Sequence, residues 1–376
     1  FRRVLFRSAI VERESHFKII ESHDLSTQSA DEIDTLITDI AQHAQSSLSL
    51  HTGDLIRGVF FKMPAGQQNR LLLIVHHLVV DGISWRILLE DLESLLVQHT
   101  QKSPLKLRPK TSSFSQWTTA LSQYANSQHA LKDLTYWKTQ VNQRVSRLPI
   151  DFAADPSSNT FESTIHLETS LDVDTTQSLL TNVPKVYRTQ INDILMTALV
   201  TTLGRWTNFQ DFEISLEGHG REELFDDLDM TRTIGWFTSL FPVRLSYQRD
   251  EELGQTIRRI KDRMRNIPAN GLTYGLLRYL NSDPQIRQSL TQQTSSQISF
   301  NYLGQFDQAT KGQYLLDEAN GDTGSDIGSA GQRQALIDIN SRVSSGQFIL
   351  HLSYSKNIFA RKTIEDFAAL YLNELR

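Results

Sequence analysis

Cysteine is absent from the 376 residues of this chain. Its absence excludes disulfides, thiolate nucleophiles and cysteine-bound zinc, and it is typical of proteins in a reducing compartment, so we expect a cytoplasmic location. A basic excess is missing as well, because 38 Lys and Arg residues face 43 Asp and Glu residues and the formal net charge is −5. A chain with this charge is not expected to bind the phosphate backbone of nucleic acids.

Long apolar runs are also missing. The longest is Leu71–Val75, which ends at two histidines, whereas a helix needs about 20 apolar residues to cross a bilayer. Residues 1–8 are basic and apolar, but they lack the apolar core and the small-residue cleavage site of a secretory signal. The sequence therefore predicts neither a membrane span nor a secretory leader, and we interpret residues 1–8 as an abrupt or foreign end.

The residues that are present are sufficient for folded cores, since 39% are hydrophobic and 22% are charged. At about 100–200 residues per domain, the length favours two units. The polar segment 153–159 is the best linker by composition. We therefore expect an N-terminal lobe, residues 1–152, and a C-terminal lobe, residues 153–376.

Hydrophobic spacing predicts helices and strands in both halves, which is typical of α/β proteins built from mixed α+β layers. Helices are expected at 30–48, 85–96, 114–128, 131–141, 189–207, 251–265 and 362–375. Strands are expected at 54–63, 70–77, 164–168, 212–217, 236–247, 297–303, 335–343 and 348–354.

The densest group of chemistry-bearing residues is the run His76-His77-Leu78-Val79-Val80-Asp81-Gly82, between a predicted strand and a predicted helix. Side chains alternate between the faces of a strand, so His76 and His77 are expected to point to opposite sides and to have different roles. Gly82 permits a tight turn, and Asp81 can cap the helix or hold a cation. By spacing alone, packing with a local hydrogen bond is the ordinary explanation of the two histidines.

A metal site is not expected at this run. His76, His77 and Asp81 are possible ligands, but adjacent histidines on a strand diverge and no second cluster has ligand spacing. The sequence also contains no GxGxxG or GxxxxGK[ST] pattern, so no dinucleotide or phosphate loop is expected.

A second candidate is Glu217, at the end of an alternating strand. Phe212, Ile214 and Leu216 occupy one face, which leaves Glu217 on the other face and followed by a glycine. The pattern offers a carboxylate to a cleft. A solvated glutamate before a turn is the ordinary alternative.

Four segments together resemble the epimerization branch of the condensation-domain superfamily of nonribosomal peptide synthetases. The histidine run resembles its HHxxxDG motif. The other three segments resemble its EGHGRE motif at 217–222, its RTVGWFTxxxP motif at 232–242 and its NYLGxFD motif at 301–307. The resemblance runs from about Leu55 to near the C-terminus, and four motifs in family order make it highly specific.

The resemblance implies two chloramphenicol acetyltransferase-like lobes in a V shape, with the active site at the lobe interface. It implies that the chain epimerises, from L to D, the Cα of an aminoacyl or peptidyl thioester. The substrate would be carried on the 4'-phosphopantetheine arm of a peptidyl carrier domain, so the expected partners are that carrier and neighbouring synthetase domains. No cofactor is expected to bind to the chain itself.

Matching positions carry the family's roles. His77 and Glu217 correspond to the proton-transfer groups. Asn301 and Tyr302 correspond to residues that line the active site, as a donor to the enolate oxygen or, for Tyr302, as a proton relay. An aromatic strand residue with a wet hydroxyl is the ordinary alternative for Tyr302.

Four residues are expected to be structural at the site: His76, Asp81, Gly82 and Arg232. The resemblance implies that Asp81 pairs with Arg232 by a charge-assisted hydrogen bond and so fixes the histidine loop. We expect three more residues to be architectural: His219, Arg221 and Trp236.

The sequence departs from the family at two places. The family's opening segment has no counterpart before Ala9, and Thr273 stands where the GxGYG loop has its second glycine. Two alternatives to epimerization remain: a condensation domain that forms peptide bonds, and an inactive module that only docks carriers. The sequence does not identify the amino acid, nor whether one base or two operate.

Overall fold

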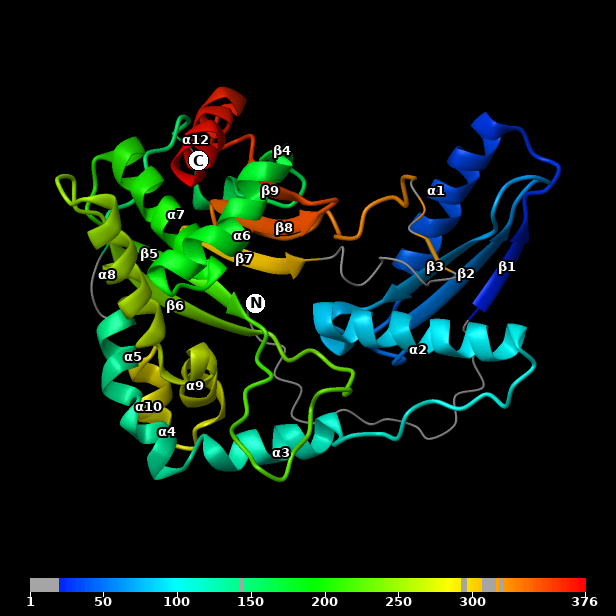
Figure 1. The fold of residues 1–376 in the computed structure, drawn as a ribbon, viewed down its shortest axis with the longest axis horizontal. Coiled ribbons are helices and arrows are strands. Elements are labelled where there is room, and N and C mark those ends of the chain that lie inside the picture. The colour runs from blue at the N-terminus through cyan, green and yellow to red at the C-terminus, as the bar shows by residue number, and fades with distance from the viewer. Residues whose placement is uncertain are drawn as a thin grey trace. The chain divides into compact units, whose positions relative to one another are not determined.

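The computed structural model describes residues 20–141, 145–153, 155–291, 296–305, 316–317, 319 and 321–376 (Figure 1). Residues 1–8, which we interpreted as a foreign end, and residues 306–307 of the fourth motif lie outside the described residues. Contacts divide the chain into two compact units. The first contains residues from 1–108, 234–236 and 313–328, and the second contains residues from 109–233, 237–312 and 329–376.

This division differs from the boundary that we expected after residue 152. The helices that follow residue 109 pack into the second unit, where Trp117 is 2% exposed and Trp137 is fully buried. Trp137 belongs to the main core cluster together with strand residues such as Phe241. Burial of large aromatic side chains therefore assigns this segment to the second unit, although it precedes the linker-like segment.

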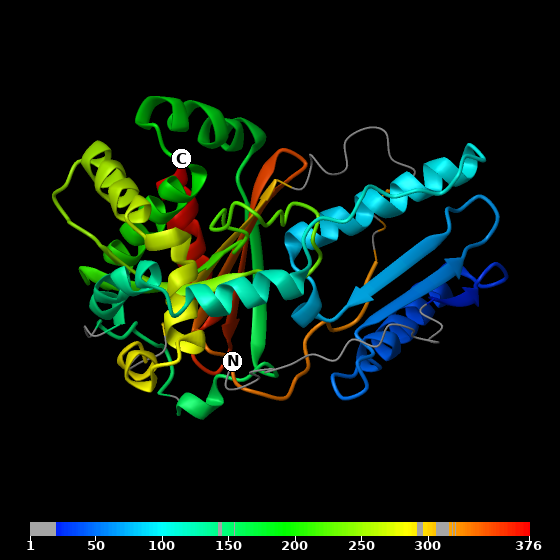
Figure 2. The ribbon, with the colours of Figure 1, turned by 90° about the horizontal axis from the view of Figure 1, so that it is seen from below.

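The first unit combines a sheet with two helices, which Figure 2 shows in blue and cyan beside the strands. Its elements are β1 (Ile20–Asp24), α1 (Ala30–Ser46), β2 (Ile56–Lys62), β3 (Arg70–Val75) and α2 (Gly82–Thr100). Strand β2 lies between β1, which is parallel to it, and β3, which is antiparallel. Ile33 and Ile37 of α1 pack with Val59 and Phe61 of β2 to form the core of this unit.

The second unit is built on a six-stranded sheet of order β4-β9-β8-β7-β5-β6. Its strands are β4 (Thr164–Ser170), β5 (Asp211–Gly218), β6 (Ser239–Ser246), β7 (Ile298–Gln305), β8 (Ile337–Ser344) and β9 (Gln347–Ser355). Its helices are α3 (Phe114–Tyr124), α4 (Gln128–Lys132), α5 (Leu134–Val141), α6 (Val173–Tyr187), α7 (Ile191–Thr207), α8 (Leu253–Arg265), α9 (Leu272–Gly275), α10 (Pro284–Ser289) and α12 (Arg361–Leu375). The β5–β7 and β7–β8 pairs are parallel, and the other pairs are antiparallel.

The sheet has one apolar face and one polar face. In β8, Ile337, Ile339 and Val343 are buried, whereas the alternating Asp338 and Asn340 are only partly buried. The apolar side chains belong to the same core cluster as residues of α7 and α12, and Figure 1 shows these two helices together beside the sheet. The polar face on the other side carries Glu217 and Asn301, which are discussed below.

Most elements expected from the hydrophobic pattern are confirmed. The sequence did not predict strand β1, helix α6 or the short helices α9 and α10, and α6 contains Pro184 in its last turn. The strand expected through His77 ends at Val75, and the strand expected from residue 236 begins only at Ser239. In the described part of the chain, no helix is long and apolar enough to span a membrane.

Candidate active site

The two histidines of the first unit have different surroundings. His76 is the N-cap of a 3-10 turn, His77–Val79, and its Nδ1 accepts a hydrogen bond of 3.2 Å from the backbone N–H of Leu78. Burial, and then the nearby charge of His77, lowers the pKa of His76, so His76 favours the neutral form. His77 is exposed at the start of the turn. His76 therefore makes a local hydrogen bond within the histidine loop, and its structural role at the site stays a prediction.

Asp81 is structural in the way that its position predicts. It is 5% exposed, and its Oδ1 accepts a hydrogen bond of 2.7 Å from the N–H of Ser84, which caps helix α2. The expected partner, Arg232, belongs to the other unit, and this pairing stays a prediction.

Gly82 does not provide the tight turn that we expected. It is the first residue of α2, its φ is not in the left-handed region, and a Cβ placed there would meet no atom within 4 Å. Neither backbone strain nor packing within the structure requires a glycine here. A small residue at this position leaves open space beside the histidine loop.

Sequence reasoning missed the role of Ser84. This side chain is fully buried, and its hydroxyl donates to the carbonyl oxygen of Gly235 at 2.9 Å and accepts from the N–H of Gly235 at 3.1 Å. The next residue, Trp236, is half-buried and lies with its ring centroid 5.1 Å from that of His77. We had expected Trp236 to be architectural, and no contact with either histidine was predicted. No local pattern in the sequence signals this contact, because the two segments are far apart in the chain.

Glu217 and Asn301 lie side by side on the polar face of the second unit. The parallel register pairs Leu216 of β5 with Phe300 of β7. Glu217 and Asn301 directly follow these two residues. The Nδ2 of Asn301 donates a hydrogen bond of 2.7 Å to Oε2 of Glu217, which is exposed. The alternation expected in β5 is confirmed at its apolar face, where Phe212, Ile214 and Leu216 are buried.

Tyr302 does not join this pair. It pairs in register with Ser341, on the apolar face of the sheet, and packs against the main core cluster. Burial raises the pKa of Tyr302 to about 12, so its phenol stays protonated at neutral pH. The structure therefore separates Tyr302 from Asn301 and Glu217, and the expected proton relay has no geometric support within this unit.

The loop after Glu217 is fixed by glycine and arginine. Gly220 has φ +66°, and a Cβ there would lie 1.7 Å from the carbonyl oxygen of Phe237, so other residues are excluded. Arg221 donates to the carbonyls of Met230 and Thr233 at 2.9 and 2.7 Å, and its guanidinium lies 3.8 Å from the ring centroid of Phe237. These contacts agree with an architectural role for Arg221.

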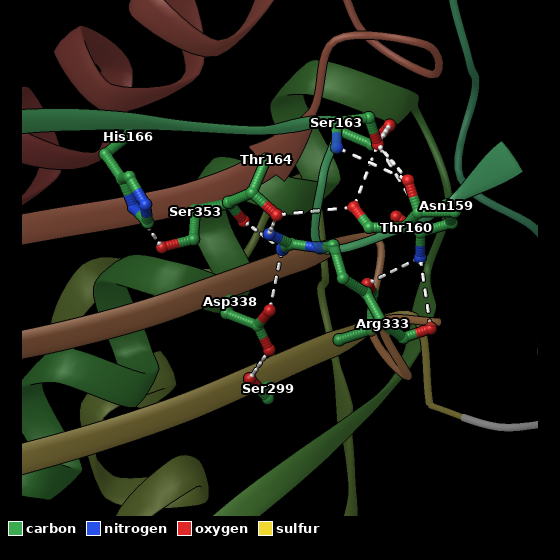
Figure 3. A network of polar contacts seen from close by, with 11 residues as sticks. Asn159, Thr160, Ser163, Thr164, His166, Ser299, Arg333, Asp338 and Ser353 are labelled. Atoms are coloured by element: carbon green, nitrogen blue, oxygen red, sulfur yellow. Dashed lines mark hydrogen bonds and ion pairs between the residues drawn. The ribbon is translucent and has the colours of Figure 1, made fainter. Parts of the chain in front are cut away.

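A second polar cluster occupies the same sheet face (Figure 3). Arg333, whose side chain is 2% exposed, donates to Asp338 Oδ2 at 2.6 Å and to the carbonyl of Ser353 at 2.6 Å. Asp338 also accepts a hydrogen bond from Ser299 of β7. Burial lowers the pKa of Arg333, and the charge of Asp338 opposes this effect. The cluster connects Ser299 of β7, Asp338 of β8 and Ser353 of β9. Ser299 lies two residues before Asn301 on the same strand, and therefore on the same face of the sheet.

Among the described residues, no group of three or more His, Asp or Glu side chains is arranged to hold a metal ion.

Comparisons with known proteins agree with the motifs. The model of the condensation-domain family matches residues 7–376. A linear gramicidin synthase protein from Brevibacillus parabrevis is 42% identical over 340 residues, and gramicidin S synthase 1 from Brevibacillus brevis is 34% identical over 347 residues. Each match covers 90% of this chain, but the chain spans only 4% and 31% of these two relatives.

Solved structures show the same fold. The epimerization domain from the third module of tyrocidine synthetase B has a TM-score of 0.86 and 34% identity, covering 95% of this chain and 78% of that one. The condensation domain from the Monacolin K polyketide synthase has a TM-score of 0.70 at 17% identity, covering 95% of this chain and 78% of that one. The second likeness shows the fold alone, and both confirm the mixed α/β fold that we expected.

Proposed function

Because the chain belongs to the condensation-domain family, we propose that it inverts the Cα configuration of an aminoacyl or peptidyl thioester from L to D. The substrate is presented on the 4'-phosphopantetheine arm of a peptidyl carrier domain. The partner supplies the thiol, since this chain has no cysteine. Support comes from the four motifs and from 34% identity to an epimerization domain over 95% of this chain.

The reaction needs two proton transfers at one carbon. A base removes the α-proton, the electron pair moves into the thioester carbonyl, and the planar enolate receives a proton on its other face. A positioned base raises the rate of proton transfer by about 10²–10⁴-fold. The enolate oxygen gains negative charge in this step, so a hydrogen-bond donor to that oxygen is also required. We assign the proton transfers to His77, in the turn that follows β3, and to Glu217, near the end of β5; both side chains are exposed.

The Glu217–Asn301 hydrogen bond is the observation that carries this assignment. The carboxylate of Glu217 accepts the amide N–H of Asn301 at 2.7 Å, which holds it in one orientation. The second N–H of the same amide is available in chemical terms to donate to the enolate oxygen. Asn301 is thus proposed to orient the base and to stabilise the charge that the base creates.

The direct test follows the configuration of the substrate. Carriers loaded with the L form and with the D form of the same aminoacyl or peptidyl group are incubated separately with the chain, and the D/L ratio is measured over time. We expect both reactions to converge on one ratio. A ratio that stays at its starting value in both reactions contradicts the proposal.

Peptide-bond formation is the second candidate, and the match to the condensation-domain model favours it. In that reaction His77 helps an amine to attack the thioester, and Glu217 has no required role. Incubation with loaded donor and acceptor carriers separates the candidates, because only condensation yields a longer peptide. Neither product is expected from an inactive docking module.

A further inference from the structure

The backbone of His77 is fixed, but its imidazole has few constraints. The turn that it begins is closed by a 3.0 Å hydrogen bond from Val79 N–H to the carbonyl of His76. Within the described part of the chain, no hydrogen bond to the imidazole is present. Its ring contact is with the indole of Trp236, at a centroid distance of 5.1 Å and an interplanar angle of 59°.

Trp236 is held in place by hydrogen bonds between Ser84 and Gly235, the residue before it. Residues 234–236 belong to the first unit although the chain on either side belongs to the second. The buried hydroxyl of Ser84 binds both backbone groups of Gly235, at 2.9 and 3.1 Å. Gly235 is the residue directly before Trp236, so these two bonds fix the point from which the indole projects.

Asp81 connects Ser84 to the histidine loop. Its carboxylate accepts the N–H of Ser84 at 2.7 Å, and both residues are buried, with 5% and 0% exposure. Asp81 ends the same loop that His77 begins. The contacts therefore form a closed circuit from His77 through Asp81, Ser84, Gly235 and Trp236 back to His77, all within one unit.

We propose that Trp236 is a positioning residue that restricts the rotamer of the His77 imidazole, and that Ser84 keeps Trp236 in place. An aromatic contact of this kind favours one arrangement by about 2- to 12-fold. If only that rotamer reacts, the rate of proton transfer falls by the same factor when the indole is lost. The kinetic consequence rests on the proposed function, whereas the positioning itself does not.

The first test observes the ring directly. In protein labelled with ¹³C and ¹⁵N at its 11 histidines, the His77 ring signals are assigned by their loss in His77→Gln. We expect Trp236→Leu to move them toward the shifts of an exposed histidine, because the ring current of the indole is removed, and Ser84→Ala to move them in the same direction. Trp236→Phe keeps part of the shift.

Trp206→Phe is the matched control, because Trp206 packs against Phe359 and Phe367 in the second unit. This variant leaves the His77 signals unchanged. His77 signals that do not move in Trp236→Leu overturn the proposal, whether or not the chain is an epimerase.

The second test separates positioning from substrate binding. We expect Trp236→Leu to lower kcat for α-proton exchange by about 2- to 12-fold with KM unchanged, and Trp236→Phe to retain most of kcat. An increase in KM with unchanged kcat overturns the proposal, as does an equal loss in the two variants. If wild-type protein shows no exchange, the proposed function fails, and the ring signals alone decide the positioning role.

Discussion

Thr273, which departs from the family pattern, makes a buried hydrogen bond with Trp137. Its side chain is fully buried, and its hydroxyl accepts a hydrogen bond of 2.9 Å from Nε1 of Trp137, which is also fully buried. The family's glycine has no hydroxyl to offer. Thr273 lies inside helix α9 and satisfies an indole that would otherwise be buried without this partner.

Replacing Thr273 by Val tests that bond. The change keeps the shape of the side chain but removes the acceptor of the Trp137 N–H, so we expect the free energy of unfolding to fall by about 1–3 kcal/mol. The measurement is urea unfolding. In a Trp137→Phe background there is no N–H to strand, so the same substitution should cost less, and equal costs in the two backgrounds would refute this role of Thr273.

Asn301 allows a prediction on pH. In Asn301→Asp a second carboxylate stands beside Glu217, and repulsion between like charges raises the pKa of one of them. If ionised Glu217 is the base, the acidic limb of the pH–rate profile for epimerization moves to higher pH. Asn301→Leu removes the hydrogen bond without adding a charge, so it should lower the rate without that displacement. Profiles with the same acidic limb in wild type and Asn301→Asp would argue against Glu217 as the base.

At the scale of elements, β5 shows what alternation predicts and what it leaves out. The pattern placed Phe212, Ile214 and Leu216 in the core and Glu217 on the opposite face, and both were right. It did not predict that Glu213, on the same face as Glu217, is buried at 7% exposure and accepts a 2.8 Å hydrogen bond from Ser296. That burial comes from a segment distant in sequence, which periodicity cannot detect.

The burial of Glu213 has a consequence for stability. Burial raises the pKa of Glu213 above 4.5, while Ser296 and Arg244 oppose this effect. Between the unfolded and folded pKa values the folded state binds more protons, so the free energy of unfolding decreases as the pH rises through this window. We expect wild type to lose more stability than Glu213→Gln between about pH 5 and pH 8, measured by urea unfolding. An identical loss in both proteins would contradict this.

The elements that the sequence did not predict have physical reasons. Strand β1 is polar and mostly exposed, so only its parallel pairing with β2 defines it. Helix α6 contains Pro184, which usually breaks a helix. The hydrogen bonds between Ser84 and Gly235 join segments that no local pattern connects. In contrast, His77, Glu217 and Asn301 are predicted as site residues because motifs, rather than periodicity, mark them.

At the scale of the molecule, the two units are not two consecutive pieces of chain. The second unit begins at residue 109, and it includes Trp117 and Trp137, which are at most 2% exposed. Length and composition predicted two units with a boundary after residue 152, whereas the contacts group residues 109–152 with the second unit. A linker-like composition at 153–159 thus marks a segment inside the second unit.

Truncation tests this division. A fragment of residues 153–376 lacks both tryptophans, and loss of two buried aromatic side chains exceeds what a marginally stable core tolerates. We expect this fragment to show no cooperative thermal transition, whereas a fragment of residues 109–376 melts cooperatively. Circular dichroism provides the comparison. A cooperative transition in the shorter fragment would show that α3, α4 and α5 are dispensable to the second unit.

Proton transfer by Glu217 at the substrate α-carbon is the central claim, and incorporation of solvent deuterium measures it most directly. A carrier-bound aminoacyl thioester is incubated in deuterated water with wild type or Glu217→Gln, and α-deuterium is quantified by mass spectrometry. We expect incorporation with wild type and a rate about 10²–10⁴-fold lower with the variant. Undiminished incorporation with Glu217→Gln would contradict the claim.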